Sequence, residues 1–225
     1  MGKLQKIAAI VFALLFNYSP LLLKAQNPSS YYVEDPHTFF GGLLLGGNFS
    51  QVDGDSYAGY HKAGLNVGGI MYARLDEELA LSMELLYSQK GSRGNRVQES
   101  GWSGVYINTY KINLNYVEIP LQINYFDKRK SHFGAGFSYS QLLSSKEEIV
   151  VDDGSGPRPV ETDTFKFFKG DVNFILAGNL HLKGGLFLNL RFQYSIMPIR
   201  KDIPPGYGRS EQFNNLWALR LMYIF

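Results

Sequence analysis

The chain has 225 residues, of which 45% are hydrophobic, 15% aromatic and 19% charged, with 24 glycines, no cysteine and a formal net charge of +2. This composition excludes a disordered chain, a collagen-like repeat and a disulfide-stapled small domain. The absence of cysteine excludes thiolate zinc sites, iron–sulfur clusters, cysteine nucleophiles and a cysteine-linked lipid anchor. The length predicts one domain.

The first 25 residues have the pattern of a secretory signal peptide. Lys3 and Lys6 form a positively charged start, residues 7–16 are uninterruptedly apolar, and Ala25 is a small residue suited to a cleavage site. An uncleaved membrane anchor is the alternative, but it needs about 20 apolar residues. Cleavage after Ala25 removes three lysines and no acidic residue, so the net charge falls from +2 to −1. A nucleic-acid role argued from basicity is thereby excluded.

From residue 39 onward, apolar and polar residues alternate with a period of two, which is the pattern of half-buried β-strands. Between Leu186 and Ile196, for example, every even position is apolar, whereas the odd positions include Asn189 and Gln193. The pattern predicts eight strands, at about 39–51, 62–74, 79–89, 111–126, 132–144, 166–182, 186–196 and 215–225.

The connections between these strands alternate in length, which is typical of outer-membrane barrels. Long segments follow every odd-numbered strand, at about 52–61, 91–110, 145–165 and 197–214, and short turns lie at 75–78, 127–131 and 183–185. We therefore predict an all-β chain, folded as an eight-stranded antiparallel up-and-down transmembrane β-barrel with four long extracellular loops and three short periplasmic turns. The expected division is a signal peptide (1–25), a periplasmic N-terminal segment (26–38) and an outer-membrane β-barrel domain (39–225).

Two features indicate that lipid, not water, surrounds the apolar face. The polar face is mostly Gly, Ser, Asn and Gln with few charges, which suits the cramped interior of a narrow barrel. Aromatic residues also recur at two heights of the apolar face, as the interfacial girdles of such barrels do. The turn-end set is Phe39, Tyr125, Phe133, Tyr223 and Phe225, and the loop-end set is Phe49, Tyr87, Tyr139, Tyr194 and Trp217. A soluble exported barrel is the remaining architectural alternative.

Two segments carry a family resemblance. The last strand alternates Trp217, Leu219, Leu221, Tyr223 and Phe225, which resembles the C-terminal signal read by the barrel assembly machinery. The run Tyr-Val-Glu-Ile-Pro-Leu at 116–121 resembles a segment common in the PorT-like outer-membrane β-barrel family of Bacteroidetes-type bacteria. The resemblance implies a small outer-membrane barrel. PorT itself is associated with a protein secretion system, but no residue here points to that role.

Pro120 breaks the strand pattern, because proline cannot donate to a β-ladder. Apolar residues occupy even positions from Ile112 to Tyr116 and odd positions from Val117 to Tyr125. One interpretation is a β-bulge near 116–120, which would switch the parity. The other is that the residues before Val117 project beyond the bilayer and follow no membrane pattern.

Six charged residues lie on the inward parity and are the candidate functional set. Since buried charges are costly unless paired, we hypothesise that Glu84 and Glu118 pair with Arg191 and Arg220 across the lumen. The expected result is a lumen plugged by side chains; a gate, a proton path or a narrow porin-like channel for small solutes is the alternative. The six residues are Arg74, Glu84, Glu118, Asp171, Arg191 and Arg220.

No catalytic motif is present, and the sequence predicts no enzyme, cofactor or metal site. Of the four histidines, only His61 approaches the loop end, with Asp55 and Ser56 nearby in sequence. A lipid-modifying enzyme is therefore kept only as an alternative. The acidic pairs at 53–55 and 152–153 lack the rest of a calcium loop.

The long loops differ in charge. The segment 146–163 has a net charge of −4, and the segment 90–109 has a net charge of +2. We expect solvated loops that contact each other or, through the basic loop, lipopolysaccharide phosphates. The predicted partners are outer-membrane lipid and lipopolysaccharide, the assembly machinery through the last strand, and an unidentified protein. The sequence as a whole predicts a structural or interaction barrel, a candidate accessory of secretion or envelope assembly.

Overall fold

The computed structural model describes residues 38–225 except 56, 58, 95–96, 100–103, 163–164 and 202–207. The predicted signal peptide and residues 26–37 lie outside the described part. Among the described residues, no helix is long and apolar enough to cross a membrane.

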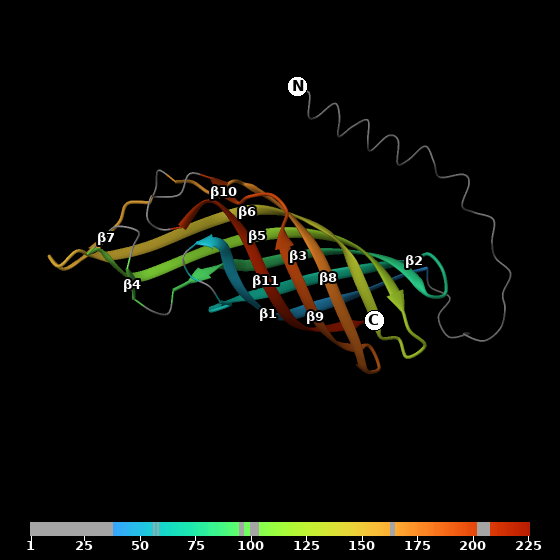
Figure 1. Ribbon diagram of the computed structural model, residues 1–225. Coiled ribbons are helices and arrows are strands. Elements are labelled where there is room, and N and C mark those ends of the chain that lie inside the picture. The colour runs from blue at the N-terminus through green and yellow to red at the C-terminus, as the bar shows by residue number, and fades with distance from the viewer. Residues whose placement is uncertain are drawn as a thin grey trace, which may run out of the picture. The chain divides into compact units, whose positions relative to one another are not determined.

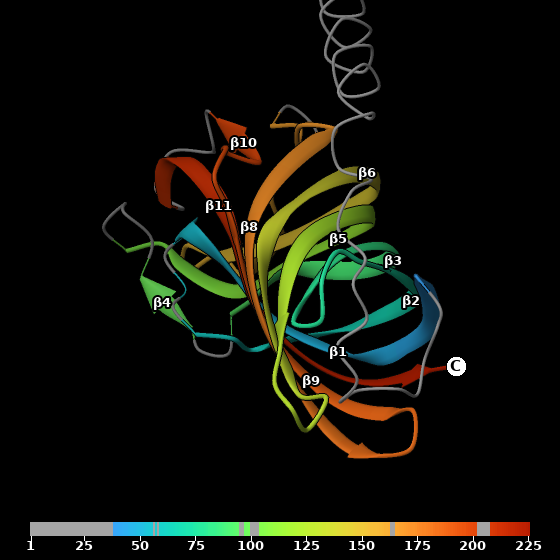
Figure 2. The same ribbon diagram turned by 90° about the vertical axis from the view of Figure 1, so that its right-hand side faces the viewer.

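Eight long antiparallel strands form a closed ring. Each long strand pairs with the next one in sequence, and the last pairs with the first, which closes the barrel (Figure 2). This confirms the predicted all-β fold with eight antiparallel strands. The strands are β1 (Phe39–Asp55), β2 (Lys62–Arg74), β3 (Leu79–Arg93), β5 (Tyr106–Phe126), β6 (His132–Asp152), β8 (Gly170–Lys183), β9 (Leu186–Ser195) and β11 (Gly208–Ile224).

Three short strands lie at the loop end of the ring. β4 (Gln98–Glu99) pairs with β5, β7 (Pro157–Pro159) with β6, and β10 (Arg200–Lys201) with β11. β5 and β6 reach farthest in this direction, with β4 and β7 beside them (Figure 1). Because β5 starts at Tyr106 and β6 runs to Asp152, much of the two predicted loops is strand.

The outward-facing residues are apolar, as predicted. Leu43 is 63% exposed and Ile123 is 59% exposed, in the middle of their strands. Such a continuous apolar exterior is unfavourable in water and favourable in a bilayer. The ten predicted girdle aromatics lie on this outward parity, and none is buried.

Of the two interpretations of the pattern near Pro120, the one in which a bulge switches the face of β5 is wrong. Even-numbered residues of β5 are buried from Tyr110 to Asn124, so one face points inward throughout. What changes is the chemistry: beyond the apolar band the inward residues become apolar, because they pack in a core of their own. The register shift falls at Asn115 and Tyr116 in the ladder with β6, where Leu143 is the extra residue.

Pro120 itself occupies an inward position. The ladder between β3 and β5 is interrupted between the pairs Met83↔Leu121 and Leu86↔Glu118, at the height of Pro120. Since proline has no N–H, the missing ladder bonds fall where the sequence cannot supply a donor.

Candidate functional site: the charged lumen

The barrel interior is layered, with two apolar clusters enclosing a polar middle. The polar middle holds six fully buried charges. The turn-end cluster is Leu44, Ile70, Tyr72, Ala80, Leu86, Phe187 and Met222. The loop-end cluster is Val52, Tyr57, Ile107, Tyr110, Ile112, Leu114, Tyr116, Ile149 and Ile199.

Aromatic rings close the turn end of the lumen. The Tyr72 ring stacks on Phe40 with centroids 4.9 Å apart, and the His132 ring stacks on Phe126 at 4.1 Å. The Tyr72 hydroxyl lies 2.9 Å from His132 Nε2, so the polar atoms of both rings satisfy each other. Phe187 contacts the His132 ring edge to face at 5.5 Å. This layer separates the polar middle from the turn-end solvent.

The first charged group is a triad centred on Glu84. Its two carboxylate oxygens pair with different arginines: Oε1 with Arg191, and Oε2 with Nη1 of Arg220 at 3.0 Å. Gln122 also donates to Oε1 at 2.9 Å. Arg220 has further partners, since its Nε donates to Asn189 at 2.7 Å. Two cations and one anion give this triad a net charge of +1.

Inward glycines make room for the triad. A Cβ on Gly46 would lie 2.2 Å from the carbonyl oxygen of Leu219 and 2.8 Å from Cγ of Arg220. A Cβ on Gly134 would lie 2.4 Å from the Asn124 side chain. The interior of an eight-stranded barrel has little spare volume, so these positions need glycine where long polar side chains cross the lumen.

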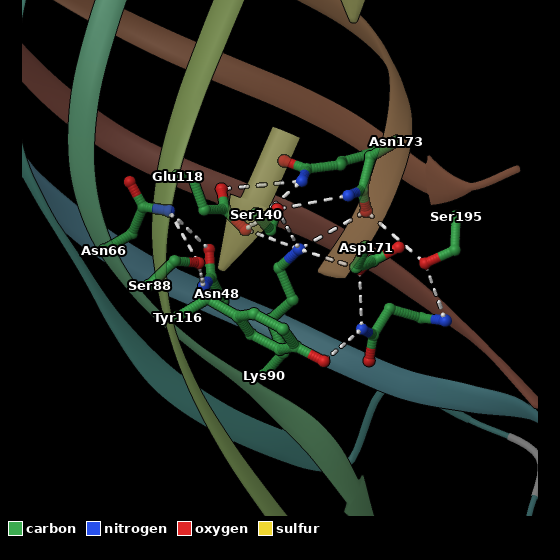
Figure 3. A network of polar contacts seen from close by, with 12 residues as sticks. Asn48, Asn66, Ser88, Lys90, Tyr116, Glu118, Ser140, Asp171, Asn173 and Ser195 are labelled. Carbon is green, nitrogen blue, oxygen red and sulfur yellow. Dashed lines mark hydrogen bonds and ion pairs between the residues drawn. The ribbon is translucent and has the colours of Figure 1, made fainter. Parts of the chain in front are cut away.

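The second charged group is a triad centred on Lys90. Its Nζ lies 2.5 Å from Glu118 Oε1 and 3.6 Å from Asp171 Oδ2, and all three side chains are fully buried. Figure 3 shows Lys90 pointing between the two carboxylates. Its Nζ also lies 4.9 Å from the centre of the Tyr116 ring. One cation and two anions give a net charge of −1.

Neutral side chains hold these carboxylates in place (Figure 3). Ser140 donates to Glu118 at 3.1 Å, and Asn214 donates to Asp171 Oδ2 at 3.0 Å. Hydrogen bonds to a carboxylate stabilise its charged form and fix its position. The two triads carry opposite net charges, so the six charges sum to zero within the lumen.

The structure brings together five of the six residues predicted from parity. Glu84 pairs with both Arg191 and Arg220, and the pairing hypothesis named these two arginines as its partners. Glu118 does not contact either arginine; it pairs with Lys90, because its own height in the lumen is that of Lys90 and Asp171.

Arg74 is the sixth predicted residue, and its placement in the lumen is wrong. Its side chain is exposed at the turn end of β2, with the guanidinium 5.6 Å from the centre of the Phe40 ring. Arg74 occupies an inward-facing position in the alternation, but its side chain is not buried because β2 ends at this residue.

Sequence reasoning missed Lys90 and Arg200. Lys90 continues the inward parity of Glu84 and Ser88, but β3 runs four residues past the predicted strand end. Extending the parity count into the predicted loop would have found it. Arg200 and its partner Glu147 lie in segments without a periodic pattern, so no sequence signal marked them.

Arg200 connects the parts of the loop end. Its Nη1 and Nη2 donate to the two carboxylate oxygens of Glu147 at 2.8 and 2.6 Å, and its Nε donates to Gln212 at 2.7 Å. Its guanidinium lies over the Phe167 ring, 4.3 Å from the centroid. Together with the loop-end apolar cluster, these contacts make a packed region, whereas the sequence predicts solvated loops there. We call the loop-end apolar cluster and the residues that pack around it the cap.

Asp55 is a half-buried carboxylate in the cap, beyond the apolar band. Burial raises the pKa of Asp55 from 3.8 to about 6, although the Tyr57 N–H donates to its carboxylate at 2.8 Å. Because the pKa of this carboxyl group is higher in the folded chain than in the unfolded chain, the folded protein loses stability as the pH rises from about 4 through 6. Between those values the folded chain holds a proton that the unfolded chain has released.

We therefore expect the cap of the wild-type protein to become easier to cleave with protease between pH 4 and 7. An Asp55→Asn variant should lose this dependence and be the more resistant of the two at pH 7. Asp76→Asn, at an exposed turn-end carboxylate, is the control. An unchanged pH profile in Asp55→Asn would contradict the assignment.

His61 precedes β2 at the loop end, and His181 lies near the turn end of β8. His61 is exposed, and Ser56 lies outside the described residues. His181 contacts the Gly184 carbonyl at 2.7 Å in its own turn. In the described ranges, no group of three or more His, Asp or Glu side chains could hold a metal ion.

The predicted C-terminal recognition segment lies on the barrel exterior. All five of its residues face outward from β11, or follow it in the case of Phe225, and all are exposed: Trp217, Leu219, Leu221, Tyr223 and Phe225. β11 lies between β1 and β9, so this segment forms the seam that closes the ring.

Comparison with known proteins agrees with this fold. Residues 25–201 match the model of a family described as outer membrane protein beta-barrel domain. The chain is similar to the solved structure of Ail, the attachment invasion locus protein of Yersinia pestis, with 9% identity, 84% of this chain and 100% of that chain covered, and a TM-score of 0.45.

Two further solved structures are similar. Neisserial surface protein A has 9% identity, with 85% of this chain and 100% of that chain covered and a TM-score of 0.43. The outer membrane protein OprG from Pseudomonas aeruginosa has 9% identity, with 83% and 94% covered and a TM-score of 0.40. No curated protein matches the sequence.

Proposed function

Because the chain belongs to the outer membrane protein beta-barrel domain family, we propose that it is a structural or interaction barrel, plugged by its own side chains. One observation carries the proposal: an apolar layer closes each end of the lumen, and paired charges fill the space between. A channel needs a continuous polar path, which neither apolar layer supplies. The protein would act through its cap, because a rigid scaffold that presents surface segments is suited to binding.

Conductance tests the plug. Purified protein in planar bilayers is expected to show no steady, large, ion-selective conductance, because ions would have to cross both apolar layers. The matched control is Tyr72→Ala combined with Tyr110→Ala, which trims one large ring from each layer and should leak more than the wild type. Folding of both proteins is checked by the temperature-dependent shift of barrels on gels. Steady conductance by the wild type would end the plug proposal.

A narrow polar path is the second candidate, favoured by one observation. In the described part of the lumen, Nε and Nη1 of Arg191, Nη2 of Arg220 and Oδ1 of Asp171 have no hydrogen-bond partner in the protein. Buried polar atoms of this kind are usually satisfied by water. The same bilayer recordings separate the two candidates, since a water-filled path open at both ends would conduct.

We further propose that the chain reaches the outer membrane by cleavage of residues 1–25 and by recognition of its last strand. The lysines and apolar run before Ala25 support the first step, and the outward alternation of β11 supports the second. The mass of the mature protein tests the cleavage. Co-purification of a stable partner in detergent would support an accessory role in secretion or envelope assembly. We assign no catalytic residue.

A further inference from the structure

A groove of about 450 Å³ lies at the loop end, between β6 and the segment 165–169. Its apolar lining includes Leu142 and Phe167, which are half-buried. Its polar lining includes the hydroxyl of Ser144 and the exposed lysines Lys166 and Lys169. The groove therefore combines apolar surface with positive charge.

The groove exists because β6 is longer than its neighbour. β6 pairs with β8 only as far as Gln141↔Gly170, whereas its pairing with β5 continues to Asp152. Near the bulge residue Leu143, the pairing of β6 with β8 has ended, whereas its pairing with β5 continues. Above it, one edge of β6 faces the groove.

Backbone hydrogen bonds fix the limits of the groove. The Leu142 N–H donates to the Lys169 carbonyl at 2.7 Å below it, and the Val160 N–H donates to the Ile149 carbonyl at 2.9 Å above it. The Phe168 N–H donates to the Ile199 carbonyl at 2.7 Å. The bonds at Lys169 and Phe168 fix the position of segment 165–169 beside β6, so the groove is part of the folded cap.

The net charge of the groove is positive. Its one lining carboxylate, Glu147, is neutralised by the two hydrogen bonds from Arg200. Neither Lys166 nor Lys169 forms an ion pair with any residue in the described part of the chain. Two uncompensated lysines favour an anionic ligand.

The groove lies at the height of lipid headgroups. Leu143 follows Tyr139, a loop-end girdle aromatic, by four residues, which corresponds to a climb of about 10 Å along a tilted strand. Leu143 is 58% exposed and Phe168 is 46% exposed, although both are apolar. Such exposure is favourable where the outermost part of the acyl chains meets the headgroups.

We propose that this groove binds the phosphorylated headgroup of an outer-leaflet lipid. Lys166 and Lys169 pair with the phosphate, and Leu143 of the groove lining contacts the apolar part of the same lipid. Free phosphate would use the lysines but not the apolar surface. The inference rests on the proposed membrane-embedded barrel and adds a ligand to it. It also moves the lipid contact away from the segment 90–109 expected from the sequence.

The test uses the full-length mature protein in phosphatidylcholine nanodiscs that contain a small fraction of lipid A. Native mass spectrometry should show one lipid A retained by the wild type and not by Lys166→Gln with Lys169→Gln. Each lysine near a lipid phosphate is expected to contribute about fivefold, so the double variant should lose about 25-fold in affinity. Lys128→Gln with Lys183→Gln, exposed at the turn end, is the matched control and should bind as the wild type does.

Three further outcomes decide the source of the phosphate and the site. Dephosphorylated lipid A should not be retained; equal retention would overturn the phosphate assignment. Inorganic phosphate at the same concentration should not displace lipid A; displacement would show a simple anion site. If the glutamine variant does not fold, Lys166→Arg with Lys169→Arg should fold and bind, and loss of binding there would overturn the proposal. Insertion into nanodiscs and conductance are read separately, so failure of lipid binding leaves the plugged barrel standing.

Discussion

A Glu84→Gln variant is expected to lose about 3–5 kcal/mol of its free energy of unfolding, the usual cost of removing one partner from a buried ion pair. Glu84 is the one carboxylate between Arg191 and Arg220. Without its charge, the triad changes from +1 to +2 in a space where all three side chains are buried. Since whole domains are stable by only about 5–15 kcal/mol, this loss should be visible as a large drop in the urea midpoint.

Arg191→Met is the matched comparison, and its cost should be much smaller. Among the described residues, Arg191 donates only to Glu84, whereas Arg220 also donates to Asn189 and Asn66. Removing Arg191 leaves a neutral Glu84–Arg220 pair and eliminates two N–H groups that lack partners. Unfolding is followed by tryptophan fluorescence in detergent. If Arg191→Met were as unstable as Glu84→Gln, the net charge of the triad would not be what matters.

Lys90→Met is expected to be destabilised by a similar amount, about 3–5 kcal/mol, for the opposite electrostatic reason. Lys90 lies between Glu118 and Asp171, and all three side chains are excluded from solvent. Its loss leaves two buried anions close together. It also removes the hydrogen bond to Asn173 at 3.3 Å and the contact with the Tyr116 ring. The measurement is again the free energy of unfolding in urea.

A double variant distinguishes unpaired charge from a simple packing defect. Lys90→Met with Asp171→Asn carries one buried carboxylate fewer than Lys90→Met, so it should recover part of the lost stability. Asp171→Asn alone is the control: it leaves a neutral Lys90–Glu118 pair and should be the milder change. A double variant at least as unstable as Lys90→Met would show that lost packing, not unpaired charge, causes the instability.

The sequence by itself determined the strand count, the strand order and the inward side of each strand. The two-residue period places Glu84, Arg191 and Arg220 on the inner face because a strand can present only two faces. The alternation of long and short connections then requires neighbouring strands to pair. Glycines at inward positions indicate a narrow interior, and at Gly46 the structure shows the side chain of Arg220 close by.

Parity was misleading where a strand leaves the apolar band. The apolar Ile112, Leu114 and Tyr116 allow a change of face as one of two interpretations, but they point inward like Glu118. A period-two pattern reports which face is apolar, and it cannot tell lipid outside the barrel from a protein core inside it. The cap has such a core, so its residues reverse the pattern without any change in the backbone.

Only the tertiary structure decided which charges meet. Parity assigns a side chain to the lumen but not to a height, and height depends on the stagger between strands around the closed ring. That stagger places Glu118 beside Lys90 and leaves both arginines to Glu84. The pairing of Arg200 with Glu147 and the groove beside β6 depend in the same way on contacts between segments far apart in sequence, for which a local pattern carries no information.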